Sequence, residues 1–503
     1  MSTSTTTGSL PDTRYAAAQN DFQQRYPAYA ATTHLDDLRA DDYIRLDLLG
    51  HVYLDYTGGG LYARSQVRAH HELLAENVFG NPHSQNPSSL AMTHLVEQAR
   101  AYVLRFFGAS PSEYTVIFTP NASGALKLVG ESYPFAPGGR YALLYDNHNS
   151  VNGIREFARM HGAAVTYVPV SLPDLRAPAE QVLAMLETAD RHHNNLFAYP
   201  AQSNFSGVHH PLDWVEEAHA RGWDVLLDCA AFTPTNRLDL SRVKPDFVPL
   251  SFYKIFGYPT GVGALIARND ALAKLHRPWF AGGTITITSV QGEGWHSLIP
   301  GSAGFEDGTV NYLNLPAVEI GLRHIERAGI DAIHERVMAL TGWLLETMAG
   351  MRHSNGAPMV YIYGPAHAGA RGGTIAFTLR DPSGEDFDFR RVEVAAAERN
   401  ISLRTGCFCN PGDGEIAHGL EREEMACYFT GTPPSSFYEF YDLLHVTTGK
   451  TPSTIRVSLG LASNFADVYH FTNFLAEFLD RRAVELPWAP EPTLAAIRQR
   501  DSA

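Results

Sequence analysis

Residues 246–263 read DFVPLSFYKIFGYPTGVG. The apolar run at 247–251 predicts a buried strand, and Tyr253 and Lys254 follow it directly, ahead of a turn rich in glycine and proline. A lysine among aromatic side chains at a strand end is partly desolvated, which lowers the pKa of its ammonium group. The amine is then free to act as a nucleophile or to form a Schiff base. Taken alone, a lysine beside a turn is more often an ordinary surface residue.

Similar short apolar runs recur along the first half of the chain. They lie at 115–119, 141–145, 164–170, 195–199, 224–228 and 262–267. Unbroken apolar runs of this length are typical of strands that are covered on both faces. Helix-like segments such as 151–162 and 211–222 separate them, and this alternation predicts an α/β fold with a mainly parallel sheet.

A carboxylate marks the strand before the lysine. Asp228 ends the run DVLLD, so in a parallel sheet Asp228 and Lys254 both lie at the carboxyl edge, where doubly wound folds bind ligands. A Schiff-base lysine with an aspartate partner for a pyridinium nitrogen is the pair that pyridoxal 5′-phosphate requires. The alternative for Asp228 is a helix N-cap. The two residues together favour the cofactor.

Three further segments follow predicted strands toward the same edge. Residues 119–127 (TPNASGALK) open a helix whose first N–H groups can bind a phosphate, and Ser123 adds a hydroxyl. His148 can stack on a planar ring. The alternative interpretation is that His148 is a solvated loop residue without a role in binding. Asn204 can hydrogen-bond a phenolate oxygen, although a lone asparagine more often stabilises a turn.

The segment RTGCFC, which ends at Cys409, and the strand residue Arg456 complete the candidate site. Arginine suits a substrate carboxylate because its guanidinium group binds both oxygens. A cysteine on a glycine-containing loop suits a mobile nucleophile. There are two alternatives: the cysteines are passive small hydrophobic residues, or Cys407, Cys409, His418 and Cys427 bind zinc. Their spacing matches no common zinc pattern.

The texture of the sequence changes near residue 310. Residues 315–351 predict one or two long helices, 373–379 and 454–459 predict strands of a smaller sheet, and 465–482 predict a closing helix. Residues 410–453 have weak periodicity and predict an insertion or an active-site loop region. The expected units are a disordered leader (1–12), a large cofactor domain (13–310), a small α+β domain (311–485) and a tail (486–503). We expect residues 13–45 to pack on the small domain.

The 503 residues carry a net charge of −15 and only four cysteines. The acidic balance argues against a nucleic-acid partner, because proteins that bind nucleic acids carry an excess of basic residues on the binding surface. Four cysteines are too few for a disulfide scaffold and favour a reducing compartment. The N-terminus lacks the features of a signal peptide, and the most apolar stretch, 247–267, contains Lys254 and two prolines. We therefore expect a soluble cytoplasmic protein that does not enter a membrane.

With these residues assigned, the chain resembles the class V aminotransferase-like enzymes called cysteine desulfurases, and more closely the desulfurase part of molybdenum cofactor sulfurase. The most specific matches are SFYKIFGYPTG (251–261) and TGCFCNPG (405–412). Weaker matches in the expected order include YLDYTGGGLY (53–62) and FGNPHSQNPSS (79–89). The resemblance implies the pyridoxal-phosphate transferase fold (aspartate aminotransferase-like, fold type I) and a homodimer with its active site at the interface.

The resemblance also implies a role for each matched residue. Lys254 would hold the cofactor as a Schiff base, Asp228 would face the ring nitrogen, His148 would stack on the ring and Asn204 would reach its O3′ atom. The residues expected to bind the cofactor phosphate are Ala122, Ser123, Ser251 and Tyr253, with Thr284 reaching the phosphate of the neighbouring subunit. The residues expected to bind substrate are Arg456, Arg404 and His83. Cys409 would be the nucleophile that forms a persulfide.

The implied reaction converts L-cysteine to L-alanine and passes the Cys409 sulfur to an acceptor protein, expected on a separate polypeptide. A C–S lyase, epimerase or aminotransferase of a specialised pathway on the same scaffold is the alternative, and a catalytically silent scaffold is a third. One departure from the family concerns the phosphate loop. Asn121 stands where glycine is usual, and we expect it to adopt the positive φ of the turn.

Overall fold

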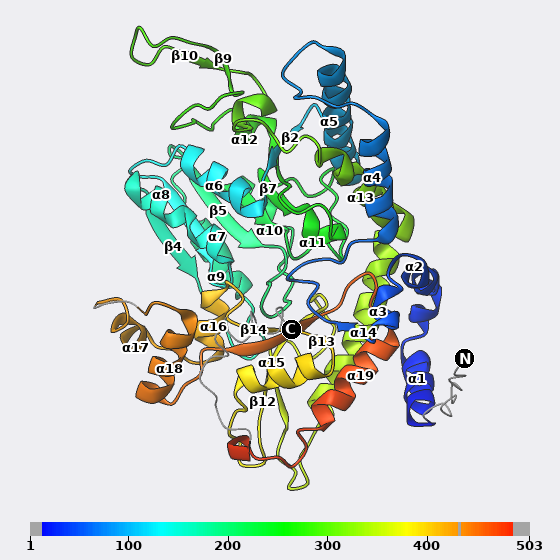
Figure 1. Cartoon of the computed structure of the whole chain (residues 1–503). Helices are drawn as coiled ribbons and strands as arrows, with labels where there is room; N and C mark the ends of the chain where they lie inside the picture. The colour runs from blue at the N-terminus through cyan, green and yellow to red at the C-terminus, as the bar shows by residue number, and fades with distance from the viewer. Residues whose placement is uncertain (1–12, 431–433, 486–503) are drawn as a thin grey trace.

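Two sheets, one large and one small, organise the chain in a computed structural model that describes residues 13–430 and 434–485 (Figure 1). The predicted leader and tail lie outside the described residues. The large sheet has the strand order β2-β8-β7-β6-β5-β3-β4. These strands are β2 (Tyr114–Thr119), β8 (Gly263–Arg268), β7 (Phe247–Ser251), β6 (Asp224–Asp228), β5 (Asn195–Pro200), β3 (Arg140–Leu144) and β4 (Ala164–Val168). Strand β8 is antiparallel to both its neighbours and the other pairs are parallel, so the prediction of a mainly parallel α/β sheet is confirmed.

Helices cover both faces of the large sheet, which explains the unbroken apolar runs. In β5, Leu196 and Ala198 pack into one hydrophobic cluster, whereas Phe197 and Tyr199 pack into the other. The helices in the first cluster are α6 (Ala122–Ser132), α7 (Asn149–Asn152), α8 (Ile154–Met160) and α12 (Asn269–Leu272). Those in the second include α5 (Pro87–Phe106), α9 (Ala179–Leu186), α10 (Trp214–Ala220) and α13 (Leu315–Ala328).

The small sheet is antiparallel, with the order β11-β12-β15-β14. Its strands are β11 (Val360–Tyr363), β12 (Thr374–Leu379), β15 (Thr454–Ser458) and β14 (Arg404–Gly406), and its main helices are α14 (Ile330–Gly350), α15 (Phe389–Glu398) and α19 (Phe465–Ala476). Gly329, at φ 80°, separates α13 from α14, so residues 315–351, predicted as one or two long helices, form two. The closing helix ends at Ala476 rather than at 482. Turns follow it, and Asp480 adopts a left-handed φ of 58°.

The segment 410–453 is helical over much of its length, so the interpretation of it as a loop region was wrong there. It forms α16 (Pro411–Ala417), α17 (Arg422–Ala426) and α18 (Phe437–Thr448). Polar N-caps begin two of these helices, since Asn410 accepts from an N–H of α16 and Ser436 from one of α18. Tyr441 and Leu444 bury one face of α18. Its other faces carry aromatic and charged side chains and also exposed apolar ones, such as Leu443 and Val446, which hides the helical period in the sequence.

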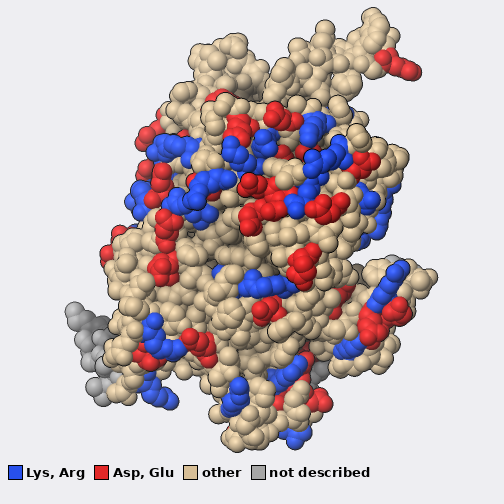
Figure 2. Space-filling view, turned by 180° about the vertical axis from the view of Figure 1, so that it is seen from behind, with Lys and Arg blue, Asp and Glu red and all other residues tan. Residues whose placement is uncertain are grey.

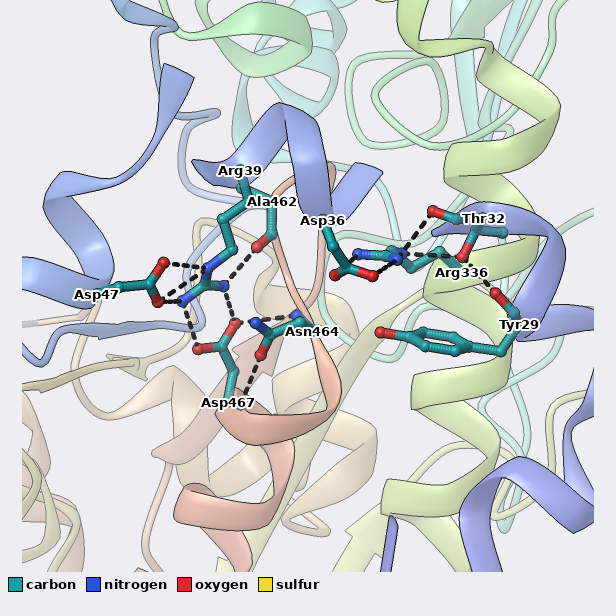
Figure 3. Close-up of polar contacts among 9 residues, drawn as sticks. All are labelled: Tyr29, Thr32, Asp36, Arg39, Asp47, Arg336, Ala462, Asn464 and Asp467. Carbon is teal, nitrogen blue, oxygen red and sulfur yellow. Dashed lines mark hydrogen bonds and ion pairs between the residues drawn. The ribbon is translucent and has the colours of Figure 1, made fainter. Parts of the chain in front are cut away.

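The N-terminal segment joins the far end of the chain (Figure 3). It forms α1 (Thr13–Arg25), η1 (Pro27–Thr32), α2 (His34–Asp42) and α3 (Arg45–Leu48). Arg39 is buried and lies between the carboxylates of Asp47 and Asp467, the latter on α19. Arg336 of α14 donates two bonds of 2.7 Å to Asp36. Then β1 (Val52–Tyr53) pairs with β13 (Ile401–Ser402) beside the small sheet.

The remaining elements lie around the large sheet, except for η3 (Ala483–Glu485), which lies beside the end of β12, where the N–H of Ala483 donates to Asp381. They are α4 (Arg64–Glu76), α11 (Phe252–Phe256), the hairpin strands β9 (Ile285–Thr288) and β10 (His296–Leu298), η2 (Ser302–Phe305) and, past α19, η3. Across the described residues, no helix is both long enough and apolar enough to span a bilayer. On the face seen in Figure 2, basic and acidic side chains are interspersed.

Candidate active site

Lys254 lies on the short helix α11, directly after strand β7 ends. Gly257 closes this helix at φ 81°, and a side chain there would meet the backbone of Tyr62 and Leu61. Lys254 lines a cavity together with Asp228 and His148. Within the described residues, no hydrogen bond or ion pair engages its amine. Burial lowers the pKa of Lys254, with Asp228 opposing the shift, so the geometry supplies a reactive amine.

Asp228 and His148 each use one polar atom in a local hydrogen bond, and the other polar atom of each side chain has no hydrogen-bond partner among the described residues. Asp228 is buried at the end of β6, and its Oδ1 accepts from the N–H of Ala230 at 3.0 Å. His148 caps α7, with its Nδ1 accepting from the N–H of Ser150 at 3.1 Å. Burial and the nearby charge of Lys254 lower the pKa of His148, so its ring is neutral near pH 7. The alternative prediction for Asp228 was a capping role. Only one of its two carboxylate oxygens, Oδ1, makes a capping bond of this kind.

The start of α6 brings together three of the residues expected to bind the phosphate, Ala122, Ser123 and Ser251. The N–H of Ala122 donates to Ser251 Oγ at 2.9 Å, and Ser123 Oγ lies 2.6 Å from Ser150 Oγ. The expectation for Asn121 was wrong. Its φ is −172°, an extended conformation, and its side chain instead caps the helix by accepting from the N–H of Gly124 at 2.9 Å. The side chain, not a left-handed backbone, makes this turn.

These groups suit pyridoxal phosphate by the chemistry of their donors and acceptors. The cavity is lined by an uncommitted amine, a buried carboxylate with an open oxygen, a neutral imidazole, and the hydroxyls beside a helix N-terminus. Lys254 would hold the cofactor's aldehyde carbon, Asp228 its ring nitrogen and His148 its ring face. The residues left for the phosphate group are Ala122, Ser123, Ser251 and Tyr253.

Arg456 and Arg404 are cross-strand partners on β15 and β14, and one carboxylate joins them. Asp55 accepts from Arg456 Nη2 at 3.1 Å and from Arg404 Nη2 at 2.7 Å. Arg456 also donates to the carbonyl of Asn204, while its buried Nε has no partner among the described residues. Sequence reasoning missed Asp55, although it belongs to the matched stretch YLDYTGGGLY.

The loop with the two neighbouring cysteines exposes one of them. Cys409 is exposed, whereas Cys407 is half-buried and burial raises the pKa of its thiol. Phe408 and Cys409 have φ of 56° and 55°, the left-handed region that non-glycine residues occupy at a cost of about 1–3 kcal/mol each. In the part of the chain that the structure describes, no three His, Cys, Asp or Glu side chains are arranged to hold a metal ion.

Asn204, expected at the ring O3′ atom, lines the cavity but is bonded to this loop. Its Nδ2 donates to the carbonyl of Phe408 at 2.7 Å, and its Oδ1 accepts from Asn410 at 3.1 Å. Sequence reasoning missed Asn410 and its neighbour Asp413, both fully buried just after the cysteines. The available signal for Asn410 was its place in the matched stretch TGCFCNPG.

His83 and Thr284 lie together, away from the Lys254 cavity. A side chain on Gly283 would lie 3.6 Å from His83 Cε1, so the two segments touch. Thr284 is buried, and its hydroxyl donates to the carbonyl of Ala281 at 2.8 Å. Neither residue is among the described residues that line the cavity. The single chain therefore does not bring these two predicted site residues into the Lys254 cavity.

Comparison with known proteins assigns the chain. The family model "Aminotransferase class-V" matches residues 52–471. The chain belongs to the class V aminotransferase family. Pyridoxal 5′-phosphate is thus the cofactor of this class V enzyme, in keeping with the groups that line its cavity.

The relatives of this class V aminotransferase family member include molybdenum cofactor sulfurases. That of Homo sapiens is 37% identical over 88% of this chain and 51% of its own length, and that of Solanum lycopersicum is 35% identical over 90% and 58%. The chain therefore spans little more than half of these curated relatives. The same fold is found in a cysteine desulfurase of Thermococcus onnurineus, with a TM-score of 0.72 at 22% identity over 88% of this chain and 98% of that one.

Proposed function

We propose that this protein is a pyridoxal-phosphate-dependent cysteine desulfurase that converts L-cysteine to L-alanine and keeps the sulfur as a persulfide on Cys409. The observation that carries the proposal is the position of Cys409. This exposed thiol sits on a turn bonded to Asn204, a residue that lines the same cavity as Lys254. The similarity to molybdenum cofactor sulfurases supports it.

The cavity residues, together with Arg456, which donates to the carbonyl of the cavity-lining Asn204, divide the work at the amino acid's Cα atom. When bound, pyridoxal phosphate supplies an electron sink for the charge that develops there. Lys254 Nζ, whose pKa is lowered by burial, accepts the Cα proton. Asp228 holds a proton on the ring nitrogen through its open oxygen. Arg456 offers its unpartnered Nε to the substrate carboxylate.

Cys409 then takes up the sulfur. Its thiolate attacks the substrate's sulfur atom, so an S–S bond forms as the bond between that sulfur and Cβ breaks. The electron pair of the broken bond stays with the substrate carbon, which takes up a proton to give alanine. The enzyme is left with a persulfide, and the net change is cysteine plus thiol to alanine plus persulfide.

Incubation of the pyridoxal-phosphate-loaded protein with L-cysteine tests the proposal. Alanine and a mass increase of one sulfur on Cys409 are expected, and both should be lost in Cys409→Ser and in Lys254→Ala. The variant Cys407→Ser should retain both products. If Cys409→Ser keeps full turnover with release of free sulfide, the enzyme is a C–S lyase and the desulfurase assignment fails. Inverted amino acid or a keto acid would instead indicate an epimerase or an aminotransferase.

The proposal extends to assembly and partners. The chain would form a homodimer through the β9–β10 hairpin, which projects from the molecule at the top of Figure 1 and exposes apolar side chains. Thr284 and His83 at its base would then serve the neighbour's site. The exposed Cys409 would hand its sulfur to an acceptor protein. All four cysteines are free thiols, which supports a cytoplasmic location.

A further inference from the structure

The strained turn at Cys409 is held from outside at two successive carbonyls. Asn204 Nδ2 donates to the carbonyl of Phe408, and the backbone N–H of Asn149 donates to the carbonyl of Cys409, both at 2.7 Å. Asn149 follows His148, so the turn rests on the segment that carries the expected ring-stacking residue. A pair of left-handed residues persists only where the surroundings over-determine it. The support therefore sets where the Cys409 side chain points.

Asn410, the next residue, is bonded at both ends of its side chain. Its Oδ1 accepts from the N–H of Asp413 at 3.2 Å and so caps α16. Its Nδ2 donates to the carbonyl of Asp146 at 2.9 Å and to Asn204 Oδ1 at 3.1 Å. One amide thus joins the start of a small-domain helix to two strand ends of the large sheet. Only the Nδ2 end makes the connection between domains.

Asp413 completes the connection. It is fully buried, and its Oδ2 accepts from Ser203 Oγ at 2.7 Å. Burial, and then the charge of Asp146, hold the pKa of Asp413 well above its usual range, which favours the uncharged form of this side chain. The contact is close, because a side chain on Gly412 would lie 2.0 Å from the carbonyl oxygen of Tyr145. The backbone at the start of α16 therefore packs directly against the residue that follows β3.

We propose that Asn410 and Asp413 are positioning residues that dock the Cys409 turn on the large domain and so hold its sulfur in line with the substrate. The set Asn410, Asp413, Ser203 and the Asp146 carbonyl is here called the Cys409 latch. This proposal rests on the proposed function for its role in sulfur transfer. The docking itself does not depend on any activity.

The variant Asn410→Asp separates docking from helix capping. Aspartate keeps the acceptor that caps α16, since Asp and Asn are equivalent N-caps, but it has no donor for the Asp146 carbonyl. Asn355→Asp is a matched control, because Asn355 also accepts from a backbone N–H and donates to a carbonyl, on the exposed surface of the small domain. Both changes replace a side-chain amide by a carboxylate, which keeps the acceptor oxygen and removes the NH2 donor.

Hydrogen exchange of the cofactor-loaded protein, without substrate, measures the docking. In Asn410→Asp, peptides covering residues 145–153 and 407–417 should exchange about ten-fold faster, with the β12 and β15 peptides unchanged. Asn355→Asp should leave all of them unchanged. Unaltered exchange in a folded Asn410→Asp protein would overturn the latch.

Kinetics with L-cysteine then separates the latch from the proposed function. Persulfide formation on Cys409 should fall about ten-fold in Asn410→Asp, while KM stays within about two-fold because Lys254 and Arg456 are untouched. Faster exchange with an unchanged persulfide rate would overturn the positioning role. If the wild-type protein formed no persulfide while exchange still rose in the variant, the desulfurase assignment would fail and the docking would stand.

Asp413→Asn and Asp413→Ala give a second pair that does not depend on the first variant folding. Because the Asp413 side chain accepts from Ser203 Oγ and asparagine keeps an acceptor oxygen at that position, Asp413→Asn should preserve both exchange and persulfide formation within about two-fold. Alanine should raise exchange as Asn410→Asp does. Equal behaviour of the two Asp413 variants would contradict a positioning role for this side chain.

Discussion

Arg456 and Asp55 form a buried ion pair, with 3.1 Å between Arg456 Nη2 and Asp55 Oδ1. Arg456 faces Arg404 across β15 and β14, and like charges directly opposite in a sheet destabilise it. Asp55 accepts from both guanidinium groups, so it offsets this repulsion. The arrangement leaves the buried Arg456 Nε without a partner among the described residues, so this N–H is the hydrogen-bonding group of Arg456 that its neighbours do not use.

Replacing Asp55 by asparagine should therefore destabilise the protein. We expect the free energy of unfolding, measured by urea denaturation at pH 7.5, to fall by about 3 kcal/mol, because a buried guanidinium loses its counter-charge. Asp331→Asn is the control, since its partner Arg237 is exposed and the loss should stay below about 1 kcal/mol. Similar losses in both variants would show that the Arg456–Asp55 pair is not special.

The four cysteines should react with iodoacetamide in an order set by exposure. Cys409 and Cys427 are exposed and should be alkylated first, whereas burial raises the pKa of Cys407 and of Cys229. Mass spectrometry of peptides after short labelling at pH 7.5 gives the order. Labelling of Cys407 ahead of Cys409 would contradict the exposed position of Cys409.

Acid should weaken the fold partly through His324. Burial lowers the pKa of this histidine to about 4, with Asp42 opposing, and its Nε2 bonds Tyr43 Oη at 3.0 Å. Its unfolded pKa is about 6.5, so the unfolded chain binds the proton more readily and stability is lost as pH falls from about 6.5 toward 4. Between pH 7.5 and pH 5 this one group accounts for about 2 kcal/mol.

The variant His324→Gln measures that contribution. Its loss of unfolding free energy between pH 7.5 and pH 5 should be about 2 kcal/mol smaller than in the wild type. His209 and His418, with pKa values lowered to about 3 and about 4 by burial, act in the same direction, so a dependence on pH should remain. The exposed His161→Gln serves as a control, and an identical change in both variants would refute the role of His324.

The proposed dimer should depend on the apolar tip of the β9–β10 hairpin. Ile287, Val290 and Trp295 are 66%, 101% and 61% exposed in the single chain. A charge at this tip would have to be buried in an interface, so Val290→Asp should shift the protein toward the monomer in sedimentation velocity runs. Val446→Asp places the same charge on an equally open position of α18 and should not. A wild-type monomer at micromolar concentration would exclude this assembly.

Much of the large domain could be predicted because its signals are local. Each apolar run becomes a strand with helices on both faces, and Lys254 meets Asp228 because each follows one of two neighbouring strands, β7 and β6. Asp55 escaped prediction because its partners Arg404 and Arg456 lie about 350 and 400 positions away, on strands whose alignment the sequence does not state. Asn121 was misjudged because its side chain replaces the backbone geometry that glycine would supply.

The Cys409 latch was missed for a different physical reason. Asn410 and Asp413 follow the cysteines in a stretch that reads as polar and irregular, where burial cannot be inferred from residue type. These two residues acquire their role only when the start of α16 contacts the segments that follow β3 and β5. Contacts between segments so far apart in the chain produce no periodic pattern in the sequence.

The contacts of the N-terminal helices also bear on how the chain is made. Arg39 and Asp467 are separated by 428 positions, and Arg336 pairs with Asp36 across 300. During translation, these helices leave the ribosome long before residues 336 and 467 have been synthesised, so the faces that pack against α14 and α19 stay uncovered over that interval. A chain truncated before residue 467 would leave the buried Arg39 without its Asp467 partner.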